Sequence, residues 1–290
     1  MQVKKAIIPC AGFGTRFLPA TKVLPKEILP IVDTPALCYI VDEAQKSGIE
    51  EIAIILSPQK EGVKKLFEPN EILNKHLSKI GDEQGYNLSN MKFSAKITFV
   101  TQEQMSGNAN AIKLCKDFAN GEPVAVLFGD DVMRVKEGDK PVTRQLIDAY
   151  ERTNCTIVGC QRTSEEVARR CGVMLTKDTG CDGVCTIDGI VEKPTGQLPS
   201  ALVSLGRFIL TPSIFDAIDS TPKSASGEVY LTDAISLLAK RERVCACEFS
   251  ARRYDIGNKQ GYLEATVDFA LENEALRGQF AKYLKGLKLD

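Results

Sequence analysis

The sequence has 290 residues, 43% of them hydrophobic, which is enough to bury a sizeable core in one large domain or two small ones. Thirty-seven basic residues nearly balance thirty-eight acidic ones, and the net charge of −1 argues against general binding to nucleic acid or to an anionic membrane. The N-terminus is too poor in apolar residues for a signal peptide, and no stretch approaches the ~20 apolar residues of a membrane span. We therefore expect a soluble, cytoplasmic protein.

The ten cysteines do not have the spacing of a disulfide framework or of a zinc site. No C-x-x-C occurs, and the nearest spacings are Cys181/Cys185 and Cys245/Cys247. The single histidine, His76, lies in a polar segment, so the usual Cys/His zinc patterns are absent. We expect reduced, buried thiols that act as small apolar residues.

The first predicted strand, at residues 6–9, leads directly into a glycine-rich segment. Gly12 and Gly14 allow tight turns and close approach of a ligand to the backbone N–H groups. The cations that follow could meet a phosphate chain; they are Arg16, Lys22 and Lys26. The segment is neither a Walker A loop nor a G-x-G-x-x-G fingerprint, because no Gly-Lys-Ser/Thr follows and Phe17 replaces the third glycine. The residues leave open a phosphate-binding loop or an ordinary surface loop with solvated lysines.

Apolar spacing predicts a helix over residues 36–47, ended by Gly48, and a buried strand over residues 51–56. A strand, a helix and a strand with short links form a βαβ unit, so the two strands should be parallel. Residues 59–93 are polar and weakly periodic. They read as an insertion of short helices and as a candidate subunit interface.

A third strand is predicted over residues 96–101, followed by small residues that open a helix over residues 108–118. A fourth strand over residues 123–128 ends in Gly-Asp-Asp at positions 129–131. Carboxylates at the carboxyl end of a buried parallel strand lie at the edge where ligands bind, and oxygen ligands there suit Mg²⁺. The alternative is an ordinary turn, because Gly-Asp is common in turns.

The second half of the chain is richer in strands, with glycines between them, and we expect its hairpins to extend the same sheet. The helix that begins at Gly227 could be capped by Ser226 or Thr232. The predicted strands lie at residues 155–161, 173–176, 183–192, 202–210 and 244–250, and the predicted helices at 142–152, 227–240, 259–271 and 274–287. These elements predict a single α/β domain over residues 1–290, Rossmann-like, with a mixed, mainly parallel central sheet flanked by helices and a β-rich half.

The glycine-rich segment resembles the signature of nucleoside-diphosphate-sugar pyrophosphorylases, (A/P)-x-A-G-x-G-T-R-x-x-P-x-T-x-x-x-P-K-x-x-x-P. The positions that match are Ala11, Gly12, Gly14, Thr15, Arg16, Pro19, Thr21, Pro25, Lys26 and Pro30. Further blocks are similar to those of the bacterial-type UTP–glucose-1-phosphate uridylyltransferases and follow in the same order: PATKVLPKEILPIVDTPAL, VLFGDD, VEKP, GRFIL, GEVYLTDAI and YDIGNKQGY. The resemblance covers essentially the whole chain, and the insertion at 59–93 also fits this subfamily.

The resemblance implies a nucleotide site, a sugar site and a metal site. The nucleotide-binding residues implied are Ala11, Gly12, Gln102 and Gly107 for uracil, Gly14, Thr15, Arg16 and Lys26 for the triphosphate, and Glu27 as a support of the same pocket. The sugar-binding residues implied are Gly172, Glu192, Gly206 and, less directly, Glu228, with Arg207 shaping the pocket. Arg16, Lys26 and Lys193 are the implied catalytic cations, with Lys193 on the phosphate of glucose 1-phosphate, and Asp130 and Asp255 are the implied Mg²⁺ ligands. Residues 1–135 then form a nucleotide-binding half, 136–258 a sugar-phosphate-binding half and 259–290 C-terminal helices.

The implied activity is transfer of UMP from UTP to glucose 1-phosphate by Mg²⁺-assisted in-line attack of the sugar phosphate, in a homodimer or homotetramer. One alternative is thymidylyl or other nucleotidyl transfer to a sugar 1-phosphate, and another is a catalytically silent regulatory homologue that binds a sugar nucleotide. The chain departs from the family at Asn108 and Asn110, where the family has Leu or Thr, and His. These amides lie beside the expected base site and could alter the choice of base.

Overall fold

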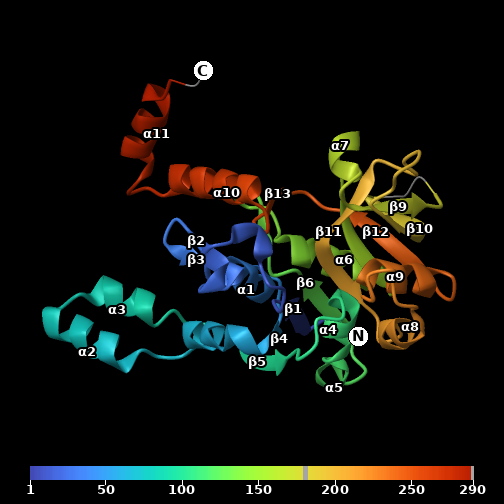
Figure 1. The fold of residues 1–290 in the computed structure, drawn as a ribbon, viewed down its shortest axis with the longest axis horizontal. Coiled ribbons are helices and arrows are strands. Elements are labelled where there is room, and N and C mark those ends of the chain that lie inside the picture. The colour runs from blue at the N-terminus through green and yellow to red at the C-terminus, as the bar shows by residue number, and fades with distance from the viewer. Residues whose placement is uncertain (179–181, 289–290) are drawn as a thin grey trace.

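The computed structural model describes residues 1–178 and 182–288 of the protein, and within these ranges nine strands form one mixed sheet (Figure 1). The strands are β1 (Lys5–Pro9), β4 (Glu51–Leu56), β5 (Lys96–Thr101), β6 (Val124–Leu127), β8 (Thr156–Arg162), β9 (Gly172–Thr176), β10 (Val184–Glu192), β11 (Leu202–Leu210) and β12 (Val244–Glu248). Their order across the sheet is β5-β4-β1-β6-β11-β8-β12-β10-β9.

The N-terminal strands β5, β4, β1 and β6 are parallel neighbours, and for β1 and β4 this confirms the prediction from the βαβ pattern. Their central members are buried on both faces, which explains their continuous apolar runs. Strand β11 then pairs antiparallel with both β6 and β8, and β10 pairs antiparallel with β12 and β9. The β-rich half therefore extends the same sheet, as expected.

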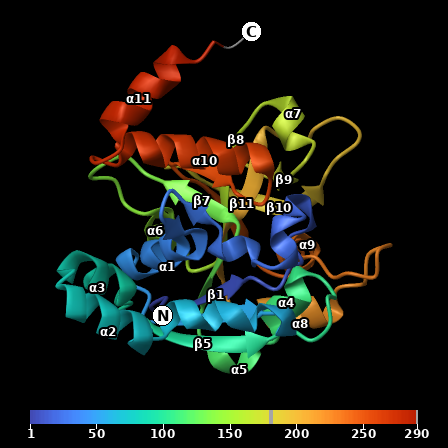
Figure 2. The same ribbon diagram turned by 60° about the vertical axis from the view of Figure 1, so that its left-hand side comes forward.

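Helices cover both faces of the sheet, as Figures 1 and 2 show from two directions. Along β1, Ala6 and Ile8 belong to the core that contains α1 (Ala36–Lys46) and α6 (Val142–Thr153). Ile7 belongs to the opposite core. The helices of this opposite core are α4 (Asn108–Lys113), α8 (Ile214–Ser220) and α9 (Leu231–Ala239). This alternation follows from the period of two along a strand.

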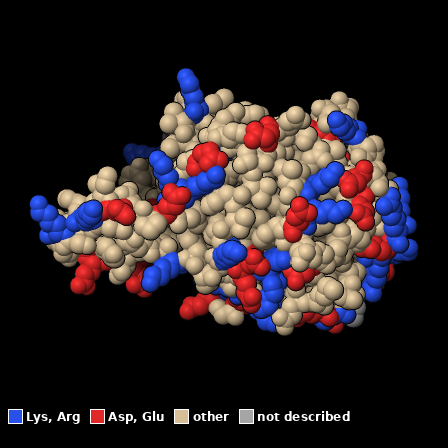
Figure 3. Space-filling view, turned by 90° about the horizontal axis from the view of Figure 1, so that it is seen from below, with Lys and Arg blue, Asp and Glu red and all other residues tan. Residues whose placement is uncertain are grey.

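Two helical arms project from this body. The insertion forms η4 (Pro58–Phe67), α2 (Glu71–Ile80) and α3 (Glu83–Ser89), and its last two helices extend to one side (Figure 1). At the C-terminus, α10 (Lys259–Glu272) runs along the body and α11 (Arg277–Gly286) leaves it (Figure 2). On the face in Figure 3, basic and acidic side chains are mixed, in keeping with the balanced charge. No helix within the described ranges is long and apolar enough to cross a membrane.

The structure corrects several predicted elements. The helix expected over 108–118 is broken into α4 and α5 (Lys116–Ala119), because Cys115 leaves helical geometry. The helix expected from Gly227 starts only at Leu231, and neither Ser226 nor Thr232 caps it. Elements absent from the prediction are α7 (Glu165–Ala168), α8, the short pair β2 (Pro30–Ile31) and β3 (Thr34–Pro35), and the pair β7 (Asp131–Arg134) and β13 (Arg252–Asp255).

The cysteines described by the structure are all free thiols, and all except Cys171 are buried. Burial raises the pKa of most of these thiols, for example that of Cys115 to about 12. They therefore contribute as small apolar residues of the core. Cys181 lies outside the described residues.

Candidate active site

A cavity of about 310 Å³ opens at the edge of the sheet where the parallel strands β1, β5 and β6 end. Three segments that follow these strands meet there, because the carboxyl ends of parallel strands lie at one edge. The lining residues are Pro9, Ala11, Gly12, Lys26, Gln102, Met105, Gly107, Asn108, Ala111, Phe128, Asp130 and Glu228. Seven predicted site residues are therefore brought together: Ala11, Gly12, Lys26, Gln102, Gly107, Asp130 and Glu228.

The glycine-rich loop turns at Gly14, which has a φ of 67° and begins the 3₁₀ turn η1 (Thr15–Phe17). The loop is closed by Thr21, whose hydroxyl donates to the carbonyl of Gly14 over 2.7 Å. Gly14, Thr15 and Arg16 do not line the cavity but lie two to four positions after Gly12, which does. The exposed Arg16 reaches the carbonyl of Gly257 with its Nη1 over 3.5 Å, so its guanidinium lies towards the turn that follows Asp255.

The segment after β5 is attached to the segment before α9. Gly107 has a φ of 100°, and a Cβ there would collide with the backbone of Val229. The carbonyl of Ser106 accepts from the Val229 N–H over 3.0 Å, and the carbonyl of Val229 accepts from the Ala109 N–H over 3.1 Å. Glycine is required at 107 because two backbones approach closely at this wall of the cavity.

Asn108 and Asn110 have structural partners. The Asn108 Oδ1 accepts from the N–H of Leu231 over 2.8 Å, at the start of α9, and the Asn110 Nδ2 donates to the carbonyl of Ser106 over 2.9 Å. Gln102 is 5% exposed and lines the same cavity, and no hydrogen bond among the described residues uses its side-chain amide. Gln102 is therefore better placed than either asparagine to form hydrogen bonds with a ligand in the cavity.

Two carboxylates converge beside the cavity. A Cβ built on Gly257 would lie 2.7 Å from an oxygen of Asp130 and 3.0 Å from an oxygen of Asp255. Their proximity comes from the antiparallel pair β7–β13, in which Asp255 lies opposite Asp131. Asp130 forms an ion pair with Lys26, and although burial favours the neutral acid, the Lys26 ammonium holds the pKa of Asp130 below its usual value. Asp130 is therefore a carboxylate at neutral pH.

These two carboxylates fit Mg²⁺. No group of three or more His, Cys, Asp or Glu side chains in the described ranges could hold a metal ion by itself. Mg²⁺ is commonly held by one or two carboxylates together with substrate phosphates and water, and hard oxygen donors are what this site offers. Asp130 and Asp255 thus suit an ion that arrives with a phosphorylated ligand.

Asp131 has a structural role beside this site. Its side chain is 3% exposed and accepts from Arg253 Nε over 2.7 Å, and burial raises its pKa to about 6 against the lowering effect of Arg253. Gly206, predicted to bind sugar, has a φ of 56° and packs so closely that a Cβ would collide with Asp131. The adjacent Arg207 is fully buried and bonds Glu43 and the Asp131 carbonyl, so it supports the site from behind.

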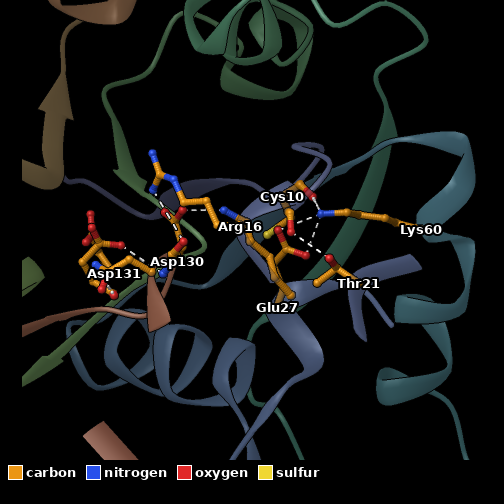
Figure 4. Close-up of polar contacts among 12 residues, drawn as sticks. Cys10, Arg16, Thr21, Glu27, Lys60, Asp130 and Asp131 are labelled. Carbon is orange, nitrogen blue, oxygen red and sulfur yellow. Dashed lines mark hydrogen bonds and ion pairs between the residues drawn. The ribbon is translucent and has the colours of Figure 1, made fainter. Parts of the chain in front are cut away.

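Glu27 lies behind the glycine-rich loop, not in the cavity. It is 1% exposed, and both of its carboxylate oxygens accept from Lys60 Nζ, over 2.8 and 2.7 Å (Figure 4). Burial raises the pKa of Glu27, and the Lys60 ammonium opposes that shift. Glu27 is therefore placed to support the pocket and not to touch a ligand.

The remaining predicted sugar residues lie on the β-rich half. Glu192 is opposite Gly172 in the β9–β10 pair, and a Cβ on Gly172 would lie 3.1 Å from Glu192 Oε2. Lys193 follows with a φ of 45°, and its side chain forms no hydrogen bond or ion pair within residues 1–178 and 182–288. Glu228 lines the cavity and accepts from the Tyr230 hydroxyl over 2.6 Å. The exposed, unpaired Lys193 ammonium is available to an anionic ligand.

The sequence reasoning missed several residues at the site. Met105 and Phe128 line the cavity, and Lys60 and Arg253 bind the two buried carboxylates beside it, Glu27 and Asp131. Both could have been found, since Met105 lies in the segment after the predicted strand at 96–101 and Phe128 ends the predicted strand at 123–128. Lys60 and Arg253 gave no signal, because each is one of many charged residues in a polar segment.

Comparison with known proteins places this geometry in a family. The model of the family described as "Nucleotidyl transferase" matches residues 5–272. The chain is 40% identical to UTP–glucose-1-phosphate uridylyltransferase 2 of Staphylococcus saprophyticus, covering 100% of this chain and 99% of that protein. It is also 40% identical to UTP–glucose-1-phosphate uridylyltransferase 2 of Streptococcus pyogenes serotype M3, covering 98% of this chain and 95% of that protein.

Solved structures of enzymes named for the same activity also resemble this chain. A UDP-glucose pyrophosphorylase complexed with UDP-glucose is 34% identical, with a TM-score of 0.83 over 94% of this chain and 100% of that chain. A UTP-bound enzyme from Acinetobacter baumannii is 30% identical, with a TM-score of 0.90 over 99% of this chain and 100% of that chain. The mixed α/β fold expected from the sequence is thus the fold of these enzymes.

Proposed function

The chain belongs to the nucleotidyl transferase family, and from that premise we propose that it transfers UMP from UTP to glucose 1-phosphate, giving UDP-glucose and pyrophosphate. The main observation behind this proposal is that one cavity is lined by the glycine-rich loop, the segment after β5 and Asp130. Full-length similarity to proteins named for this reaction supports the same choice of substrates. A catalytically silent homologue is disfavoured, because the charged residues that the reaction needs are present.

The chemistry would need no protein nucleophile, because the phosphate of glucose 1-phosphate is already ionised at neutral pH. The glycine-rich loop, with Gly14 and Thr15, would orient the triphosphate for in-line attack on its α-phosphorus. Arg16 and Lys26 would offset the charge that develops on the departing pyrophosphate, and Lys193 would hold the attacking phosphate. Asp130 and Asp255 would hold Mg²⁺, and the bound ion would neutralise part of the phosphate charge.

The two halves of the chain would divide the substrates. Residues 1–135 would bind the nucleotide through Ala11, Gly12, Gln102 and Gly107, and residues 136–258 would bind the sugar phosphate, with 259–290 as C-terminal helices. Gly172 and Glu192 lie together on the second half, and Gly206 and Glu228 lie nearer to the cavity wall. A cytoplasmic location fits this proposal, because both substrates are made inside cells.

The two projecting arms would join copies of the chain into a homodimer or homotetramer. Ile72, Ile80 and Leu88 on the insertion, and Tyr283 on α11, are between 59% and 85% exposed. Apolar side chains gathered on projecting helices are typical of protein interfaces. A second copy of this chain would cover them, and the mass measured by light scattering reports the assembly.

Pyrophosphate release from UTP with glucose 1-phosphate and Mg²⁺ tests the proposed function. We expect release with UTP, loss of release on chelation of the metal, and recovery on addition of Mg²⁺. The replacement Lys193→Met should raise the KM for glucose 1-phosphate about 10- to 100-fold, because a charge-assisted hydrogen bond contributes about 1.5–3 kcal/mol. The KM for UTP should change little. Preference for dTTP would favour the thymidylyl alternative, and no release with any nucleotide would favour the regulatory one.

Asn108→Ala tests whether the departures from the family affect base choice. The Leu231 N–H at the start of α9 would lose its acceptor, so we expect a loss of about 1 kcal/mol in the free energy of unfolding. The ratio of UTP to dTTP turnover should stay unchanged, because the Asn108 oxygen is already occupied. Urea denaturation and parallel assays with the two nucleotides give both quantities. A tenfold change in the ratio of UTP to dTTP turnover would instead show that Asn108 contributes to the choice of base.

A further inference from the structure

A buried ammonium lies directly beneath the glycine-rich loop. The Lys60 side chain is 7% exposed and its partner Glu27 is 0% exposed. Lys60 Nζ donates to both Glu27 oxygens, over 2.8 and 2.7 Å, and to the carbonyl of Cys10 over 2.7 Å (Figure 4). An ammonium has three N–H donors, so these acceptors use its full capacity.

These contacts join three separate segments, of which the glycine-rich loop and η3 contribute residues to the cavity and η4 does not. Cys10 is the residue between β1 and the loop that begins at Ala11. Glu27 lies in the 3₁₀ turn η3 (Lys26–Ile28), and Lys60 lies in η4, which follows β4. One side chain from the insertion therefore fixes both the entrance of the glycine-rich loop and the turn that closes it.

The turn η3 points two neighbouring side chains, Lys26 and Glu27, in different directions. A 3₁₀ helix advances one residue by a third of a turn, so adjacent side chains point in different directions. Glu27 points into the protein towards Lys60, and Lys26 lines the cavity and pairs with Asp130. Holding Glu27 therefore sets the direction in which Lys26 leaves the backbone.

We propose that Lys60 is a positioning residue for the triphosphate of the nucleotide, acting through the Cys10 carbonyl and through Glu27 on Lys26. This inference rests on the proposed function. Lys60 would touch no substrate, because its three donors already have partners within the protein. Its effect is to hold the loop amides and the Lys26 ammonium in the arrangement that a phosphate chain requires, as preorganised catalysis demands.

A purely structural role for the pair is the alternative. Apolar side chains of similar size often stabilise a protein as well as a buried ion pair does, so stability alone gives little reason for charges here. The two roles differ in what they predict. A structural role affects folding and both substrates together, and a positioning role affects the nucleotide selectively.

The test compares Lys60→Met, the double variant Lys60→Met/Glu27→Gln and the control Lys5→Met. Lys5 lies at the end of β1 that is far from the glycine-rich loop, and its side chain is 12% exposed and pairs with Glu122. Lys5→Met therefore removes an ion pair of β1 without changing a contact of the loop. For each protein, UTP binding is measured by calorimetry with Mg²⁺, KM is measured for each substrate, and Tm is measured by circular dichroism.

We expect Lys60→Met to lower kcat/KM for UTP by about 100-fold, the effect of a small misplacement of binding groups, and to leave the KM for glucose 1-phosphate within about twofold. The double variant should recover the Tm lost by Lys60→Met, because no unpaired buried carboxylate remains, and should keep the defect in UTP binding. Lys5→Met should leave UTP binding unchanged.

Recovery of UTP binding together with Tm in the double variant would overturn the proposal, as would equal effects on both substrates or the same UTP defect in Lys5→Met. Failure of the proposed function gives a different result. In that case the wild-type protein would neither bind UTP nor release pyrophosphate from it.

Discussion

Replacement of Asp130 by asparagine is expected to reduce kcat with UTP and glucose 1-phosphate by about 10³-fold or more. Asp130 is one of the two carboxylates that face the space beside Gly257, and the Lys26 ammonium keeps it ionised. An asparagine of the same shape loses the negative charge that a divalent cation requires. Charge stabilisation by a metal supplies several kcal/mol to a phosphate transition state, and each 1.36 kcal/mol is tenfold in rate.

The variant should remain folded. The Asp130 and Lys26 side chains are 29% and 17% exposed, so their ion pair is only partly buried, and asparagine keeps a side-chain oxygen that can accept from Lys26. Asp139→Asn provides a matched control, because Asp139 is an exposed carboxylate outside the cavity. Turnover is measured with increasing Mg²⁺ and Tm by circular dichroism. A kcat for Asp130→Asn within tenfold of the wild-type value, at an unchanged Tm, would show that Asp130 does not serve the reaction.

Much of the fold could be predicted because its strands carry strong local signals. The predicted strands at residues 51–56 and 96–101 coincide with β4 and β5. The cavity could also be predicted, since parallel strands end at one edge of a sheet and the residues after them must meet. Both inferences need only the hydrophobic pattern and the positions of glycines and charges.

The parts that could not be predicted depend on contacts between distant segments. The pair β7–β13 joins residues more than a hundred positions apart, and neither strand is apolar enough to stand out. The start of α9 is set by Asn108, on another segment, and not by the nearby Ser226 or Thr232. Lys60 likewise reaches Glu27 only through the path of the insertion. Local sequence patterns do not encode such partners.

Arg207→Met is expected to lower the free energy of unfolding by about 3–5 kcal/mol, the cost of breaking a buried ion pair on one side. Arg207 is fully buried, and its guanidinium forms a two-pronged pair with Glu43 of α1, with Nε to Oε1 at 3.0 Å and Nη2 to Oε2 at 2.7 Å. Nη2 also donates to the carbonyl of Asp131 over 2.7 Å. The variant leaves the Glu43 charge without its cation inside the core.

The double variant Arg207→Met/Glu43→Gln separates the cost of the stranded charge from the loss of the contacts. Glutamine keeps an oxygen for the N–H and hydroxyl of Thr143, which bond Glu43 Oε1 over 3.0 and 2.6 Å. We therefore expect most of the lost stability to return in urea denaturation followed by circular dichroism. In both variants the Asp131 carbonyl loses the Arg207 donor, so we expect the turn that carries Asp130 to be loosened and kcat to be reduced in both. A loss below about 1 kcal/mol for Arg207→Met would mean that the core tolerates the unpaired Glu43 charge, and that Arg253 is sufficient to hold Asp131.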